Sequence, residues 1–107
     1  MSVERKGTKN DSNKPNIALI PKDALWGMAS ALSFGAKKYG KHNFRKGIEY
    51  LSLAAACQRH LTAWCDGEDT DSESGLSHLD HALASLAMLK FMEINRKEMD
   101  DRYKDEK

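Results

Sequence analysis

The segment from Arg59 to His81, RHLTAWCDGEDTDSESGLSHLDH, contains three of the chain's four histidines and a run of acidic residues. Apolar periodicity ends at Asp66-Gly67 and resumes near Gly75-Leu76, which predicts two antiparallel helices joined by an acidic loop. If the turn is centred near Thr70, proton carriers and potential metal ligands from both helices come together beside this loop.

Counting outward from that turn gives specific pairings. His60 falls opposite Asp80 and His81, and His78 lies within reach of the helix end near Trp64. Carboxylates bind hard cations such as Mg²⁺, and Mn²⁺ also accepts imidazole. The segment therefore predicts a divalent-metal site whose candidate ligands are Glu68, Asp71, Glu73, His78 and Asp80.

A metal at this position would suit phosphoryl or nucleotidyl chemistry, because it neutralises phosphate oxygens and activates water. His60 or His81 would then be the catalytic general base. Both residues lie on the predicted helices that flank the loop.

Each candidate also has a structural explanation. Glu73 follows Thr70, and Asp80 follows Ser77, at the spacing of a helix capping box. The loop carboxylates suit a solvated loop, and His78 suits a polar helix surface. His60 lies among apolar residues, so we expect it to be partly buried and in need of hydrogen-bond partners.

The second segment with possible chemistry is the basic loop from Gly35 to Gly47, GAKKYGKHNFRKG. Glycines allow backbone N–H groups to approach an anion, and the basic side chains could neutralise a phosphate chain. A solvated connection is the alternative. His42 is expected to be exposed there, whereas Trp26, Trp64, Phe34 and Tyr39 are expected mostly in the core, where one of them could stack on a base.

The remaining pattern predicts an all-α fold, a small helical bundle. We expect a short extended segment at residues 17–20, then helices over residues 21–35, 48–65 and 76–93 or beyond. The third helix is apolar on most sides from Ala82 onward, which predicts burial against a second copy of the chain.

Length and composition limit the alternatives. The 107 residues suit one domain: a flexible arm at 1–15, a helical domain at 16–94 and a charged extension at 95–107. A net charge of +1 gives little reason to expect nucleic acid or a membrane as partner. No signal segment is recognised at the N-terminus, which predicts a cytoplasmic location. Cys57 and Cys65 are expected to be reduced core thiols.

Several sequence blocks, in order, resemble a known family: KPNIALIP, ALSFGAKKYGKHNFRKGIEY, RHLTAW, GED and ESGLSHLDHALASL. Together they resemble the dATP/dGTP diphosphohydrolase N-terminal family of phages, which includes MazZ-type enzymes. The resemblance covers about Lys14 to Leu89. It implies a fold related to the MazG-like pyrophosphohydrolases, which use Mg²⁺ or Mn²⁺ to cut a nucleoside triphosphate into a monophosphate and pyrophosphate.

The resemblance also implies roles for individual residues. Lys37, Lys38, Tyr39 and Asn43 are expected near the substrate, with Arg59, His60, Glu68, Asp71, Glu73, His78 and His81 at the active centre. One departure is clear: the E-x-x-E and E-x-x-D motifs of MazG-like proteins are replaced by R-H-L-T and H-L-D-H.

The sequence therefore predicts a metal-dependent enzyme, dimeric or tetrameric, that converts purine dNTPs (dGTP and dATP) into dNMP and pyrophosphate, with Arg59 and the basic loop holding substrate. A protein of the same fold that sequesters a nucleotide without cutting it is the main alternative. A helical interaction module without a small-molecule site is the third.

Overall fold

The chain is described by a computed structural model that covers residues 7–8 and 13–105. Its described part contains three α-helices and no β-strand: α1 (Lys22–Tyr39), α2 (Tyr50–Cys65) and α3 (His78–Asn95). Short 3-10 turns lie at Ile17–Leu19, Asn43–Lys46 and Lys97–Met99. The all-α prediction is confirmed. Most of the predicted arm at 1–15 lies outside the described residues.

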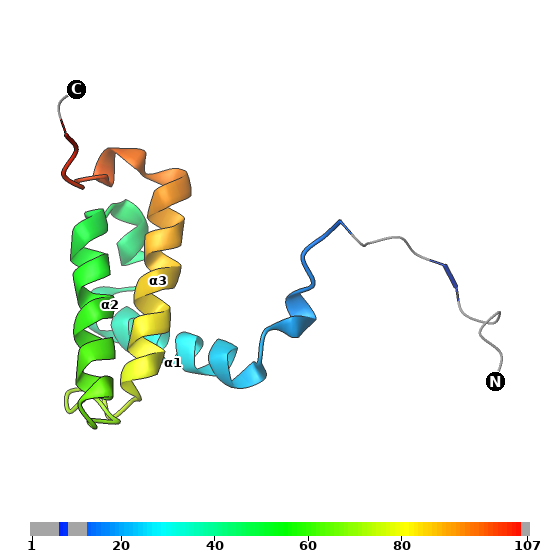
Figure 1. Ribbon diagram of the computed structural model, residues 1–107, viewed down its shortest axis with the longest axis horizontal. Helices are drawn as coiled ribbons and strands as arrows, with labels where there is room; N and C mark the ends of the chain where they lie inside the picture. Colours follow the sequence, from blue (N-terminus) through cyan, green and yellow to red (C-terminus); the bar gives the residue numbers. More distant parts are fainter. Residues whose placement is uncertain (1–6, 9–12, 106–107) are drawn as a thin grey trace.

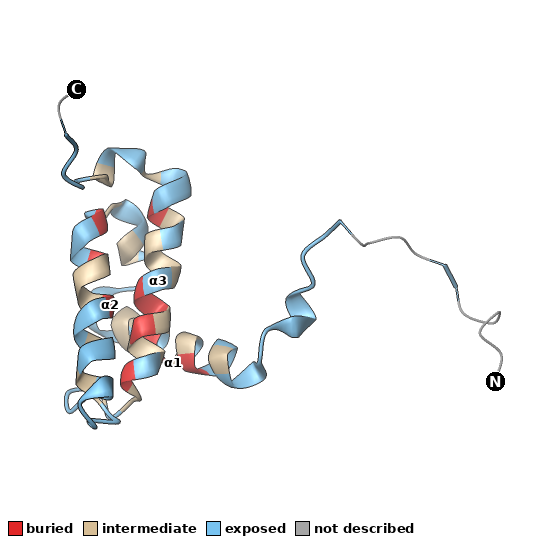
Figure 2. Ribbon diagram, viewed as in Figure 1, coloured by how far each residue is buried: buried red, intermediate tan, exposed pale blue. Residues whose placement is uncertain are grey.

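Helices α2 and α3 lie side by side and run in opposite directions, and α1 crosses α3 (Figure 1). The predicted antiparallel pair is therefore present. Buried residues face the contacts between helices (Figure 2). Small side chains allow α1 and α3 to approach closely, because Gly27 and Ala31 on α1 and Ala84 on α3 are all buried.

The core at the far end of the α2–α3 pair is built around Met92, which is fully buried against Tyr50 and Leu53. The Tyr50 hydroxyl donates to the backbone oxygen of Met92 over 3.4 Å. Phe44 and Phe91 add an edge-to-face pair with centroids 5.5 Å apart. The turn at Asn43–Lys46 is thereby fixed to the bundle.

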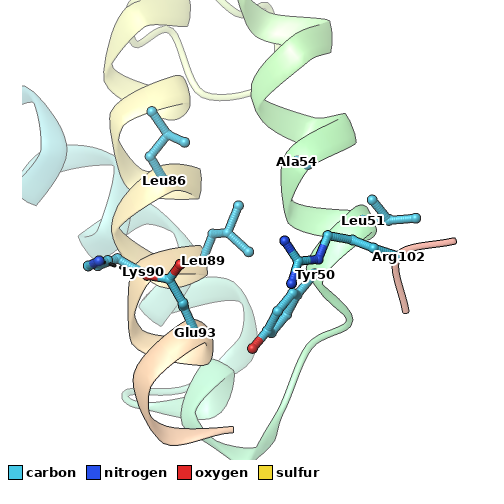
Figure 3. A pocket seen from close by; sticks show the side chains of 8 residues that line it. All are labelled: Tyr50, Leu51, Ala54, Leu86, Leu89, Lys90, Glu93 and Arg102. Carbon is cyan, nitrogen blue, oxygen red and sulfur yellow. Dashed lines mark hydrogen bonds and ion pairs between the residues drawn. The ribbon is translucent and has the colours of Figure 1, made fainter. Parts of the chain in front are cut away.

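Residues after α3 return to the start of α2. The Asp101 carboxylate accepts a hydrogen bond from the N–H of Leu51 over 3.0 Å, satisfying a backbone donor in the first turn of α2. The Arg102 guanidinium lies 5.4 Å from the centre of the Tyr50 ring. Figure 3 shows the cavity of about 280 Å³ at this end, lined partly by Arg102, Tyr50 and Leu89.

Two local predictions are wrong. Residues Ile17–Leu19 form a 3-10 turn rather than an extended segment. Helix α1 continues through Gly35 and ends at Tyr39, because Gly40, with φ of 95°, provides the positive-φ conformation that ends a helix. Ala36, Lys37 and Lys38 are good helix formers, so one glycine does not stop the helix.

The expected positions of aromatic and thiol side chains also need correction. Trp26 is 72% exposed, Tyr39 63% and Trp64 43%, so these three do not contribute to the core as expected. Cys57 is a buried free thiol, as predicted, whereas Cys65 is free but exposed. None of the described helices has both the length and the apolar character needed to cross a membrane.

Candidate active site

The connection between α2 and α3 is a tightly hydrogen-bonded loop. Helix α2 ends in a Schellman motif, in which Gly67 N–H donates to Trp64 and Glu68 N–H donates to Ala63. Gly67 has φ of 98°, which favours glycine. The loop then folds back on itself, because Asp71 N–H donates to Leu76 over 2.8 Å.

The start of α3 is fixed from both sides. The Ser77 hydroxyl accepts from Leu79 N–H as an N-cap, and His78 N–H donates to the backbone oxygen of Asp69 over 3.0 Å. Ser77 therefore caps α3, whereas the Asp80 carboxylate, predicted as the other half of a capping box, lies against α1. These bonds set the position of His78 and, one turn later, of His81.

His60 on α2 faces His78 on α3. Their Nδ1 atoms are 2.8 Å apart, and the other ring nitrogen of His78, Nε2, is 2.7 Å from Oε1 of Glu68. His78 is buried, with 5% of its surface exposed, whereas Glu68 is exposed. His60 is half-buried, as predicted from its apolar neighbours.

His81 is held from a second direction by Ser74. Its Nε2 lies 2.7 Å from the Ser74 hydroxyl, which is 3.0 Å from Oδ2 of Asp71. The hydroxyl also accepts from Leu76 N–H over 3.1 Å. The sequence analysis did not identify Ser74, although short side chains such as Asp71 commonly accept from a backbone N–H a few residues later in a loop, as Asp71 does from Ser74.

These contacts define which nitrogens carry protons in the neutral site. The Ser74 hydroxyl has one proton, which it donates to Asp71, so Nε2–H of His81 donates to the hydroxyl oxygen. Nδ1 of His81 therefore keeps a free lone pair. By the same reasoning, His78 donates from Nε2 to Glu68 and accepts at Nδ1 from His60.

The surroundings lower the pKa of both His60 and Asp71, for different reasons. Burial lowers the pKa of His60 below its ordinary value, and the neighbouring His81 and His78 lower it further. For Asp71, burial alone would raise the pKa of the carboxyl, but hydrogen bonds from Ser74 and the nearby His81 hold it below the usual range. The site thus favours a neutral imidazole beside an ionised carboxylate.

His60, Asp71 and His78 form a group that could hold a metal ion, since one ligand atom from each lies within 4.8 Å of the others. Two imidazole nitrogens and one carboxylate oxygen suit a transition ion such as Mn²⁺ better than Mg²⁺. Glu68 then resembles the outer carboxylate that commonly orients a metal-binding imidazole.

Three predicted metal ligands are not members of this group: Glu68 contacts His78 from outside it, and Glu73 and Asp80 lie elsewhere. Glu73 forms an ion pair with Lys38 near the end of α1. Asp80 lies instead against α1, where a methyl group on Gly27 would overlap its Oδ1. The predicted pairing of His60 with His81 is present, as the rings stack with centroids 4.7 Å apart, but Asp80 does not face His60 with it.

Helix α1 brings basic residues to the loop. The Lys38–Glu73 pair raises the pKa of the Lys38 amine above its ordinary value. Four residues earlier, Phe34 packs edge-on against His81 with centroids 6.0 Å apart. Of the other predicted substrate residues, Lys37 and Tyr39 are exposed at the end of α1, Asn43 is half-buried and Arg59 is exposed next to His60.

Comparison with known proteins identifies the family of the chain. A family described as "dATP/dGTP diphosphohydrolase, N-terminal" matches residues 4–102. The chain belongs to this family. It is also 33% identical, over 96 residues, to the protein named dATP/dGTP diphosphohydrolase of Salmonella phage PMBT28. No solved structure matches the chain.

The match covers 90% of this chain but 33% of the phage relative. The chain thus spans about one third of the length of that relative. These matches confirm the family that the sequence blocks resemble.

Proposed function

We propose that the chain hydrolyses purine deoxynucleoside triphosphates, dGTP and dATP, to the monophosphate and pyrophosphate with the help of Mn²⁺ or Mg²⁺. The observation that carries this proposal is the approach of His60, Asp71 and His78 to within 4.8 Å at the ligand atoms. Family membership and the name of the phage relative support the nucleotide substrate.

The donor atoms favour Mn²⁺ over Mg²⁺, because Mg²⁺ prefers oxygen ligands. In this proposal His60, His78 and Asp71 hold the cation, and Glu68 orients His78. The bound cation would supply charge neutralisation for phosphate oxygens and a more acidic water.

Residues around the His60, Asp71 and His78 group are proposed as the general base and as the phosphate-binding side chains. Nδ1 of His81 has a free lone pair, because Ser74 fixes the proton on Nε2. His81 is therefore our candidate for the general base, and His60, assigned to the base role from sequence as an alternative, becomes a ligand. Lys38, Lys37 and Arg59 are proposed to hold the phosphate chain.

The test is incubation with dGTP or dATP and Mn²⁺ or Mg²⁺, followed by chromatography. We expect dGMP or dAMP with equimolar pyrophosphate, and a loss of at least about hundredfold in kcat for His81→Ala. His42→Ala is the matched control, because His42 is exposed in the loop after α1.

A nucleotide-sequestering protein remains the alternative function, because the basic residues and the histidine group could bind a triphosphate without cutting it. Tight binding of dGTP with no dGMP produced would favour sequestration. Absence of both binding and turnover would reject the nucleotide proposal itself.

A further inference from the structure

A second cavity is lined by residues of α1 and α3. It has a volume of about 450 Å³ and is lined by one face of α1 and by a single residue of α3, Asp80. The α1 residues are Lys22, Asp23, Trp26, Gly27 and Ser30. The mechanism proposed above uses none of them.

Two features of this cavity concern the side chains that line it, namely an exposed aromatic ring and a glycine that makes room for a carboxylate. Trp26 is 72% exposed, although a large aromatic ring gains most when it is covered. Gly27 is a buried glycine in the interior of α1, where glycine weakens a helix. A side chain there would overlap Oδ1 of Asp80 and lie 2.7 Å from its Cγ, so the glycine makes room for this carboxylate.

The cavity and the histidine group share helix α3. Asp80 and His81 are consecutive on α3, while Gly27 and Phe34 contact them from α1. Seven residues of helix separate Gly27 from Phe34, a rise of about 10 Å. A nucleotide whose phosphates lie at the histidines and Lys38 would extend its base along α1 toward Trp26.

We propose that this cavity binds the base of the nucleotide and favours guanine over adenine, so that dGTP is the better of the two proposed substrates. The inference rests on the proposed purine nucleotide substrate and adds the determinant of base choice. The Trp26 ring stacks on the base, as aromatic side chains do on every base. The Asp80 carboxylate accepts hydrogen bonds from N1–H and the N2 amino group of guanine, and the Lys22 amine faces O6.

Adenine presents the wrong edge to the same residues. Its N1 is an acceptor and would face the Asp80 carboxylate, while its N6 amino group would face the Lys22 amine. A site built to accept from a base rejects one that cannot donate there. Asp80 is assigned this role rather than Asp23 because Asp80 is half-buried between two helices, whereas Asp23 is exposed on α1.

The experiment measures binding without hydrolysis. In a Trp64→Phe background the remaining fluorescence comes from Trp26, and dGMP or dAMP is titrated in. We expect dGMP to quench Trp26 with an affinity about tenfold or more above that of dAMP. Asp80→Asn should abolish most of the preference, because the amide can no longer accept from both N1–H and the N2 amino group of guanine. Asp23→Asn, the matched control, should retain it.

Equal quenching by the two monophosphates would overturn the inference, and so would loss of the preference in Asp23→Asn with retention in Asp80→Asn.

The stacking role of Trp26 is tested separately. Trp26→Ala should raise KM for dGTP more than it lowers kcat, and Trp26→Phe should restore KM in part. A change of assembly state in Trp26→Ala with an unchanged KM would instead assign this surface to a second copy of the chain and overturn the inference.

The experiments give different results if the proposed hydrolysis is wrong and if the base cavity is wrong. Selective binding of dGMP that depends on Asp80, without turnover of any dNTP, would support the base cavity and reject hydrolysis. Turnover of dNTPs with no effect of Asp80→Asn on the ratio of dGTP to dATP would reject the base cavity alone.

Discussion

The imidazole rings of His60 and His81 are stacked, with their planes inclined by 15° and their centroids 4.7 Å apart. Two rings in this arrangement resist carrying positive charge together, and burial adds to the cost at His60. The α2–α3 pair thus holds His60 in surroundings that lower its pKa.

The first prediction concerns stability and pH. Because the pKa of His60 is lowered in the folded protein from its ordinary 6.5, the unfolded chain binds the extra proton more readily. The contribution of His60 to the free energy of unfolding should therefore be fully present above pH 6.5. It should be lost as the pH decreases from 6.5 toward the lowered pKa of His60 in the folded protein. Asp71 adds a further loss only below its ordinary 3.8. Urea unfolding at a series of pH values measures both losses.

His60→Gln should flatten this dependence between pH 7 and pH 5, because glutamine does not titrate there. His42→Gln, a change at an exposed histidine, should retain the slope of the parent protein. Equal slopes for all three proteins would show that His60 does not couple protonation to folding.

The second prediction concerns metal affinity. Glu68 contacts His78 rather than completing the group that could hold the ion, so Glu68→Gln should weaken Mn²⁺ binding by about 10- to 100-fold without abolishing it. His78→Ala should have a larger effect. Calorimetric titration with Mn²⁺ measures both, and Glu93→Gln, a change at an exposed residue of α3, is the control. Unchanged affinity in Glu68→Gln would remove Glu68 from the site.

The third prediction concerns Ser74, which positions His81 through Nε2. Ser74→Ala should lower kcat by about tenfold to a hundredfold, since a misplaced catalytic group loses its alignment, and should leave KM nearly constant. It should also shift the acidic limb of the pH profile of kcat, a change that a general loss of stability would not produce. Ser72→Ala in the same loop is the control. A profile that matches the parent would contradict the role.

The fourth prediction compares two glycines of α1. Gly35→Ala should stabilise the protein by about 0.5–1 kcal/mol, because a methyl group there has no atom within 4 Å and alanine favours the helix. Gly27→Ala should destabilise it by about 1–3 kcal/mol, because the methyl group displaces the Asp80 carboxylate.

Combining Gly27→Ala with Asp80→Ala separates the two effects of this glycine. The added alanine should then become stabilising, as it is at Gly35. Thermal and urea unfolding of the two single variants and this double variant provide the measurement. Equal destabilisation by Gly27→Ala in both backgrounds would show that Asp80 is not the reason for the glycine.

The pairing of His60 with His81 was predictable because it depends only on local rules. A helix rises by a constant amount per residue, so counting outward from the loop matches positions across the α2–α3 pair. The partial burial of His60 followed in the same way from its apolar neighbours on α2.

Asp80 shows where such counting fails. One residue along α3 is a rotation of about 100°, so Asp80 points away from His60 and lies against Gly27 of α1, whereas His81 stacks on His60. The crossing of α1 over α3 brings Gly27 against Asp80, which no spacing within α2 and α3 reveals. Ser74 was missed because its importance comes from a hydrogen bond seven residues away.

The return of residues 100–105 to the start of α2 determines where the chain can be attached to something else. This end of the α2–α3 pair is opposite the loop that carries Glu68 and Asp71 (Figure 1). A reporter, tether or additional domain joined after residue 105 would therefore emerge far from the imidazoles and leave them accessible. Deleting residues 100–105 would remove the Asp101 acceptor from α2, so the protein should tolerate extension at this end better than truncation.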